Sequence, residues 1–311
     1  GRMLRQTLLT VSRNEKIRDL SVSLPVTRQV VMRFVAGEQI PDAVSASAEL
    51  AATGRLATID RLGEDVLELA DAERTRDDYL ALLTALDANG LTSDAEVSVK
   101  LSAVGQALPG DGEKIALDFA HQIAAKANAV GTTVTLDMED HTTTDSTLAI
   151  VRELRKEFPS VGAVIQAYLY RSEADCRDLA YEGSRVRLCK GAYKEPEDVA
   201  YQSKHEVDLA YVRCLKILMA GKGYPMVASH DPRLVDIAQS LAIHNDRAKG
   251  SYEHQMLYGV RPEEQQRLAD SGEKMRVYIP YGEDWYGYMV RRMAEKPANM
   301  ALFLKSLSSK K

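Results

Sequence analysis

Two cations stand three residues apart in the stretch 185–193, which has the sequence RVRLCKGAY. Its apolar residues are typical of a short buried strand, and Arg187 and Lys190 lie at or just past the C-terminal end of that strand. Ligands of α/β proteins bind at this end of the strands. Gly191 lets the backbone approach a ligand closely or adopt positive φ. The stretch predicts the floor of a cofactor site that needs fixed positive charge. The alternative is a buried strand that ends in a surface Lys-Gly turn.

Other polar residues stand on or just after short apolar stretches. They are Lys100, Asp137, Gln166, Ser229, His230, Glu253, Gln255 and Tyr278. A charged group inside an apolar strand is costly unless it is paired. Such residues on successive strands therefore predict a shared polar cavity, although each one alone is also explained by a solvated strand end or a structural ion pair.

Arg291 and Arg292 are adjacent near the C-terminus. Two neighbouring guanidinium groups suit a carboxylate clamp, because each can donate two parallel hydrogen bonds. Glu295 and Tyr288 lie three or four residues from this pair, which is the spacing of neighbours on a helix surface, so we expect Glu295 to hold the side chain of Arg291. The pair indicates a carboxylate site, with a solvated helix surface as the alternative.

The histidines give little support for a metal site or for a Ser-His-Asp triad. His230 has no second ligand at metal-binding spacing, which favours a ligand contact or a structural role. His141 follows an acidic pair in a stretch that is explained equally well by a polar loop. Ser229, His230 and Asp231 are consecutive, so their side chains point apart on a strand and do not form a Ser-His-Asp triad.

Eight short apolar stretches alternate with helical patterns from residue 55 onward. The expected strands are 56–60, 97–101, 133–137, 163–168, 185–190, 226–230, 253–257 and 275–279. The expected helices are 64–86, 113–129, 145–157, 173–182, 198–221, 231–244, 262–271 and 284–295. We expect the strands to be near-continuously apolar, rather than alternating, because both faces are buried. Eight βα units predict a distorted (β/α)8 TIM-type barrel, and the lack of Gly-x-Gly-x-x-Gly after the first strand weakens a doubly wound sheet.

Residues 3–54 are expected to form an N-terminal helical arm, with helices at 10–24, 26–36 and 43–50. Residues 55–307 would form the barrel, and the whole chain would be a single catalytic domain. Pro297 would end the last helix.

The bulk composition excludes several classes of protein. The 311 residues carry a net charge of −5, which gives no sign of a nucleic-acid partner. The three cysteines have no Cys-x-x-Cys spacing, so we expect no disulfide framework and no zinc site, in keeping with a cytoplasmic compartment. No apolar run approaches the roughly 20 residues of a membrane span, and no signal peptide is visible.

Seven segments, taken in order, resemble the proline dehydrogenase family. They are 98–102 (SVKLS), 136–137 (LD), 187–193 (RLCKGAY), 228–230 (ASH), 252–255 (YEHQ), 278–282 (YIPYG) and 288–295 (YMVRRMAE). The resemblance covers nearly all of the expected barrel. It implies non-covalently bound FAD, oxidation of L-proline to Δ1-pyrroline-5-carboxylate, and transfer of the electrons to a membrane quinone.

The same resemblance implies roles for matching residues. The implied catalytic residues are Asp137 and Arg187, the latter near the flavin N5. The implied substrate contacts are Lys100, Tyr278, Tyr288, Arg291, Arg292 and Glu295, with the carboxylate held by the lysine and the two arginines. The implied FAD contacts are Met138, Gln166, Arg187, Lys190, Gly191, Ala192, Ser229, His230 and Glu253.

This chemistry suits the residue types. The cofactor would take the hydride, while the protein would supply position and charge. A cation such as Arg187 would stabilise the anionic reduced flavin, and the carboxylate clamp would hold the ring within reach. No protein base is required if the substrate amine is neutral, so Asp137 is either a base or an orienting residue. We expect the orienting role, in which case an Asp137→Asn variant would keep its rate.

The resemblance further implies a cytoplasmic protein in peripheral contact with the inner face of the membrane. Pyrroline-5-carboxylate dehydrogenase would follow it in the pathway. A non-enzymatic binding barrel is one alternative, which the many convergent charges disfavour. Two enzymatic alternatives also remain open from the residues alone. One is a Schiff-base lyase resembling class I aldolases, with Lys190 or Lys100 as nucleophile. The other is a different flavin-dependent barrel, such as a folate reductase.

Overall fold

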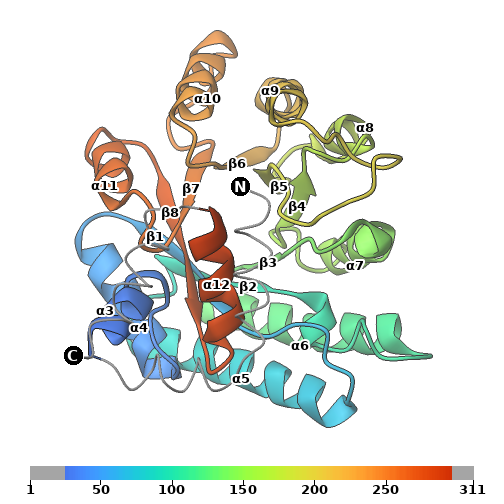
Figure 1. Ribbon diagram of the computed structural model, residues 1–311, viewed down its shortest axis with the longest axis vertical. Coiled ribbons are helices and arrows are strands. Elements are labelled where there is room, and N and C mark those ends of the chain that lie inside the picture. The colour runs from blue at the N-terminus through green and yellow to red at the C-terminus, as the bar shows by residue number, and fades with distance from the viewer. Residues whose placement is uncertain (1–24, 296–311) are drawn as a thin grey trace.

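Eight parallel strands alternate with helices in the computed structural model, which describes residues 25–295 and the side chains of residues 28–293 (Figure 1). The strands are β1 (Leu56–Arg61), β2 (Ala95–Val99), β3 (Val134–Leu136), β4 (Ala163–Gln166), β5 (Arg185–Cys189), β6 (Tyr224–Ala228), β7 (Glu253–Leu257) and β8 (Met275–Tyr281). The helices are α3 (Pro25–Phe34), α4 (Ile40–Ala52), α5 (Leu69–Ala88), α6 (Gly112–Val130), α7 (Thr144–Arg155), α8 (Ser172–Leu179), α9 (Lys204–Ala220), α10 (Pro232–His244), α11 (Pro262–Asp270) and α12 (Trp285–Glu295). Two short 3-10 helices, Leu101–Ala103 and His141–Thr143, follow β2 and β3.

The sheet closes into a barrel at a narrow seam between β3 and β4. The hydrogen-bonded order is β3-β2-β1-β8-β7-β6-β5-β4, and the ends of this order meet at a parallel bridge between Thr135 and Gly162. Gly162 N donates to Val134 O at 2.8 Å, and Leu136 N donates to Gly162 O at 2.9 Å. A Cβ on Gly162 would lie 2.4 Å from Oγ1 of Thr135, so glycine is what allows this approach. The predicted (β/α)8 architecture is confirmed.

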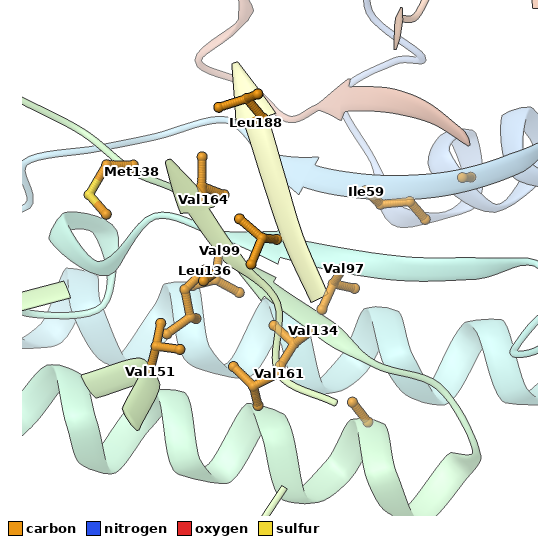
Figure 2. Packing of buried hydrophobic residues seen from close by; sticks show 14 of the residues in the cluster. Ile59, Val97, Val99, Val134, Leu136, Met138, Val151, Val161, Val164 and Leu188 are labelled. Atoms are coloured by element: carbon orange, nitrogen blue, oxygen red, sulfur yellow. The ribbon is translucent and has the colours of Figure 1, made fainter. Parts of the chain in front are cut away.

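The strands alternate between polar residues that face the barrel interior and apolar residues that face the helices. Inward positions include Thr58, Glu96, Ser98, Arg185, Arg187, Gln255 and Arg276, which hydrogen-bond to side chains of other strands inside the barrel. Outward positions include Ile59, Val97, Val134, Leu136 and Leu188, which share the main hydrophobic cluster with Val151 of α7 (Figure 2). The expectation of near-continuously apolar strands is therefore wrong. Both faces are buried, but the inner face is buried against paired charges.

The first and last described helices pack together at the C-terminal end of the barrel. α3 and α12 share a second hydrophobic cluster with Leu62 and Val260, which follow the ends of β1 and β7. In Figure 1, α12 is drawn across the ring of strands, inside the ring of the other helices. α4 packs instead on β1 and β8, and the linker before it is fixed by Ala36 N, which donates to Pro280 O at 2.9 Å. The last helix therefore lies over the mouth of the barrel, and α4 covers the outside of β8.

α5 begins at Leu69, five residues later than the predicted start at residue 64. Gly63 and Asp65 have φ of +143° and +52°, which a helix does not accommodate. Asp65 N donates to Ser102 Oγ at 2.9 Å, so the loop is tied to the end of β2.

α9 begins at Lys204, so the prediction that a helix opens at residue 198 is wrong. Ser203 caps the helix by accepting from Glu206 N at 3.1 Å. The residues before it pair with the segment after β4, where Tyr170 N donates to Val199 O at 3.0 Å and Tyr201 N donates to the main chain of residue 168 at 2.8 Å. This pairing keeps the chain extended until the cap.

The predicted helix at residues 10–24 and the predicted break at Pro297 lie outside the described residues. The division into an arm of residues 3–54 and a barrel of residues 55–307 therefore remains a proposal. Between residues 25 and 295, every helix is too short or too polar to cross a membrane.

Candidate active site

Four of the predicted residues meet at the C-terminal end of the barrel. Lys100 Nζ lies 3.1 Å from Oδ2 of Asp137 and 3.1 Å from the hydroxyl of Tyr278. The Tyr278 hydroxyl donates to the same Asp137 oxygen at 2.6 Å, and Arg187 donates to the other oxygen at 2.5 Å. With Asp60, which accepts from Lys100 Nζ at 3.3 Å, these residues form what we call the mouth cluster.

Asp60 is the one member of the mouth cluster that was not predicted. It stands near the end of β1, as Asp137 stands just after β3, so the rule that identified Asp137 would also have identified it. Burial raises the pKa of Asp60 to about 6, against the opposing charge of Lys100. The mouth cluster therefore contains a carboxyl group that can take up a proton close to neutral pH.

Lys100 and Asp137 are both charged at neutral pH. Burial alone would lower the pKa of Lys100, but the neighbouring Asp60, Tyr278 and Asp137 outweigh it and hold that pKa well above its usual value. Burial opposes ionisation of Asp137 as well, yet the charges of Lys100 and Arg187 bring its pKa below the usual range. A protonated lysine is not a nucleophile, so this geometry speaks against a Schiff base on Lys100.

Arg187 is held by acceptors on two strands and by the residue that follows a third strand. Its Nε donates to Gln255 Oε1 on β7 at 2.6 Å, and one terminal nitrogen donates to Ser98 Oγ on β2 at 2.8 Å. The other terminal nitrogen bonds to Asp137, and the guanidinium carbon lies 5.3 Å from the centre of the Tyr278 ring. These contacts fix the plane of a buried cation.

The loop that follows β5 packs against Tyr168. Gly191 has φ of +115°, and a Cβ there would lie 2.3 Å from the ring of Tyr168. The hydroxyl of Tyr168 accepts from Tyr193 N at 3.3 Å and donates to Glu195 at 3.5 Å. Glu195 also accepts from the backbone N–H of His141 at 3.2 Å and pairs with its ring. Tyr168 and Glu195 were not predicted, because nothing in their local sequence distinguishes them from ordinary loop residues.

The predicted FAD contacts that follow β5 and β6 are not part of the mouth cluster. Lys190 Nζ lies 2.8 Å from Asp208 and 3.4 Å from Asp231, so it is part of an ion-pair group between α9 and α10. Ser229 Oγ accepts from Asp231 N at 3.1 Å. His230 Nε2 accepts from the backbone N–H of Leu257 on β7 at 2.9 Å. Ala192 is exposed in the loop that follows β5.

Gln166 and Met138 lie together at the ends of β4 and β3. The Gln166 amide donates to Glu139 O at 2.9 Å, and both side chains help to line a small cavity with Thr144. The amide oxygen of Gln166 is buried and has no hydrogen-bond partner among the described residues. An orphaned acceptor of this kind is uncommon in a protein interior and is available to a ligand or a water molecule.

The predicted carboxylate clamp lies on α12. Arg292 is stacked on Tyr288, with its guanidinium carbon 5.0 Å from the ring centre, and Arg291 is exposed. Since α12 packs at the C-terminal end of the barrel, the pair lies at the same end as the mouth cluster. The side chain of Glu295 is outside the described side chains, so its predicted hold on the arginines remains a prediction.

Glu253 does not join this site. It is the first residue of β7, and it pairs with Arg276 at 2.7 Å and accepts from Tyr224 at 2.9 Å at the N-terminal end of the barrel. Glu96 and Arg185 form a second pair at this end, at 2.8 Å. Glu253 was predicted to contact FAD, but it opens its strand and therefore lies at the end of the barrel opposite the mouth.

Comparison with known proteins gives one consistent family. The family model described as "Proline dehydrogenase" matches residues 43–303. Proline dehydrogenase 1 of Bacillus subtilis (strain 168) is 38% identical over 308 residues, covering 99% of this chain and 100% of that protein. Proline dehydrogenase of Deinococcus radiodurans is 39% identical over 311 residues, covering 98% of each chain. The crystal structure of proline utilization A (PutA) from Bdellovibrio bacteriovorus, inactivated by N-propargylglycine, superposes with a TM-score of 0.79 at 27% identity. That match covers 91% of this chain but only 36% of the PutA chain.

Proposed function

The chain belongs to the proline dehydrogenase family, and we propose that it oxidises L-proline to Δ1-pyrroline-5-carboxylate with FAD as cofactor and a quinone as electron acceptor. The observation that carries this proposal is the mouth cluster, in which Lys100 and Arg187 are held as fixed cations around Asp137. Charges held in fixed positions are what a cofactor-dependent oxidation of a small amino acid needs from a protein.

The residues at the ends of β3, β4 and β5 fit a flavin. Gly191 brings the backbone close to Tyr168 where a side chain would clash. Gln166 offers an orphaned buried acceptor, which suits a ligand with N–H donors such as a flavin ring. Arg187 is a buried cation of fixed orientation, suited to an electron-rich ring. We propose that these residues hold FAD together with Met138, Lys190, Ala192, Ser229 and His230. When bound, FAD would accept the hydride equivalent that no amino-acid side chain can accept.

Charge balance explains why the substrate carboxylate needs the arginines of α12. In the mouth cluster, Lys100 and Arg187 face Asp60 and Asp137, so the ionised cluster is neutral overall. A further carboxylate bound to Lys100 would leave one uncompensated negative charge. In our proposal Arg291 and Arg292, at the same end of the barrel, carry the positive charge that compensates it.

Tyr278 and Tyr288 would border the proline ring, the first from β8 and the second from α12. Burial and the charge of Asp137 raise the pKa of Tyr278 well above its usual value, so it remains a neutral hydrogen-bond donor. Asp137 is a weak base because its pKa is lowered. We therefore assign Asp137 an orienting role toward Lys100, Arg187 and Tyr278, in keeping with a substrate amine that reacts in its neutral form.

The same proposal places the protein in the cytoplasm, with peripheral contact at the inner face of the membrane where the quinone resides. Pyrroline-5-carboxylate dehydrogenase would consume the product.

Turnover with a soluble quinone analogue tests the proposed reaction. The purified protein is mixed with L-proline and the quinone, and quinone reduction is followed together with formation of the cyclic imine. We expect one imine for each quinone reduced. Flavin reduction by a nicotinamide without any reaction with proline would instead support another flavin-dependent barrel. A substrate trapped on Lys190 by borohydride would support the lyase.

A further inference from the structure

We propose that Gln255 is a positioning residue for Arg187, and that Glu253 fixes the direction in which the Gln255 amide points. The inference rests on the proposed flavin chemistry, in which Arg187 supplies fixed positive charge beside the cofactor. It gives a role to two residues deep in the barrel, below the mouth cluster.

Gln255 connects the two polar layers of the barrel interior. Its side chain is buried, and its Oε1 accepts from Arg187 Nε at 2.6 Å. Its Nε2 donates to Glu253 Oε2 at 2.9 Å. Glu253 accepts in turn from Arg276 at 2.7 Å, so a continuous series of hydrogen bonds runs from the N-terminal end of the barrel to Asp137.

The two neighbours of Gln255 determine its orientation chemically. An arginine can only donate hydrogen bonds and an ionised carboxylate can only accept them. The Gln255 amide must therefore present its oxygen to Arg187 and its NH2 group to Glu253. A flipped amide would bring two donors together at one end and two acceptors together at the other.

Glu253 stays ionised, as this argument requires. Burial by itself would raise its pKa, but the charges of Arg276 and Arg185 outweigh burial and lower the pKa to about 2. Its two oxygens are engaged by Arg276, Tyr224 and Gln255. The NH2 group of Gln255 thus donates to a carboxylate that stays ionised and that belongs to the same strand, β7.

The bond from Gln255 controls the plane of the guanidinium group. Asp137 and Ser98 hold the terminal nitrogens of Arg187, which are its outermost atoms. Gln255 holds Nε, which is the nitrogen nearest the aliphatic part of the side chain. Without this acceptor, the buried Nε–H of Arg187 would have no hydrogen-bond partner. The arginine side chain would then lower its free energy by turning toward another acceptor. The positive charge of Arg187 would then move relative to the mouth of the barrel.

The reduction potential of the bound flavin tests this role. In Gln255→Met, Arg187 should stabilise the reduced flavin less well, and the preference for reduced over oxidised flavin should fall about tenfold. For a two-electron couple this corresponds to a potential lower by ~30 mV. The shift should disappear when Gln255→Met is made in an Arg187→Lys background, because lysine has no Nε donor.

Gln265→Met is the matched control. Gln265 is also buried, and it donates to Leu257 O at 3.1 Å and Val260 O at 2.9 Å, but it lies on α11 outside the barrel interior. We expect this variant to lower the melting temperature and leave the flavin potential unchanged. An unchanged potential in Gln255→Met, or an equal shift in the Arg187→Lys background, would overturn the inference.

A second variant covers the case in which Gln255→Met does not fold. Gln255→Asn keeps an amide in the barrel but is one methylene too short to reach both Arg187 and Glu253. We expect Gln255→Asn to lower the reduction potential of the bound flavin by the same amount. If the wild-type protein takes up no flavin, both the proposed function and this inference fail. If the wild-type flavin is reduced by proline and neither Gln255 variant shifts its potential, only the inference fails.

Discussion

Arg187 of β5 donates to Asp137, just after β3, at 2.5 Å, and each side chain is only 8% exposed. A buried ion pair of this kind contributes little net stability, because desolvation offsets the attraction. Removing one partner alone is costly, about 3–5 kcal/mol, since it leaves an unpaired buried charge. We infer that the pair is kept for the position it imposes on the cation.

Asp137→Asn separates orientation from base catalysis. Asparagine keeps the shape of the side chain but removes the charge that faces Lys100 and Arg187. We expect a less stable protein whose pH profile of kcat/KM keeps the shape of the wild-type profile. If Asp137 were the base, the rate would fall by about 10²- to 10⁴-fold and one limb of the profile would be lost. Steady-state rates between pH 5 and 9 decide between the two outcomes.

Lys100→Met tests the carboxylate site. The variant leaves Asp60 and Asp137 without the lysine between them, and it removes the charged donor that we propose for the substrate carboxylate. We expect the KM for proline to rise by about 10- to 100-fold, as for the loss of a hydrogen bond to a charged group. Lys156→Met is the control, because that lysine is 73% exposed and pairs only with Glu153 among the described ion pairs. An unchanged KM in Lys100→Met would remove Lys100 from the substrate site.

Gly191→Ala tests the close backbone approach in the loop after β5. The new methyl group would meet the ring of Tyr168 at 2.3 Å and must push the loop aside. We expect the Kd for FAD to rise at least about tenfold, equivalent to about 1.4 kcal/mol. Gly183→Ala is the control, because Gly183 also has positive φ but nothing lies within 4 Å of its added Cβ. Equal FAD affinity in both variants would show that the approach at Gly191 is not needed for the cofactor.

Much of the site was predictable because barrel strands place their last inward residues at one end. Lys100, Asp137, Arg187 and Tyr278 were identified on this basis and by resemblance, and the structure brings them into contact. Asp60 follows the same rule and was overlooked.

The place of Glu253 and the start of α9 depended on where strands and helices begin. The contact of Tyr168 with Gly191 depended on packing between distant segments. Glu253 was assigned to the mouth although it opens its strand, and the predicted bounds of β7 already contained that information. Ser203, with Glu206 three residues later, is a recognisable cap that would have placed the start of α9. The contact of Tyr168 with Gly191 joins two loops, and no local pattern predicts it.

Glu139 gives a prediction for the dependence of stability on pH. Burial raises its pKa to about 7, against the hydrogen bonds from Ser102. The folded state therefore holds a proton that the unfolded chain releases near pH 4.5, so stability is lost as the pH rises from about 4.5 to 7. Glutamine mimics the neutral form. The stability of Glu139→Gln relative to wild type should thus rise over this range by ~3 kcal/mol at most.

Urea unfolding of both proteins at pH 4.5, 6 and 8 measures this difference. A relative stability that does not change with pH would show that Glu139 titrates normally in the folded protein.

The visible absorption spectrum before and after anaerobic addition of L-proline tests the central claim most directly. We predict a flavin spectrum in the purified protein, or after FAD is added, that bleaches when L-proline is added. A flavin spectrum indifferent to proline would contradict the assigned substrate and leave the nicotinamide-linked reductase as the explanation. A colourless protein that takes up no FAD would contradict both the cofactor and the reaction.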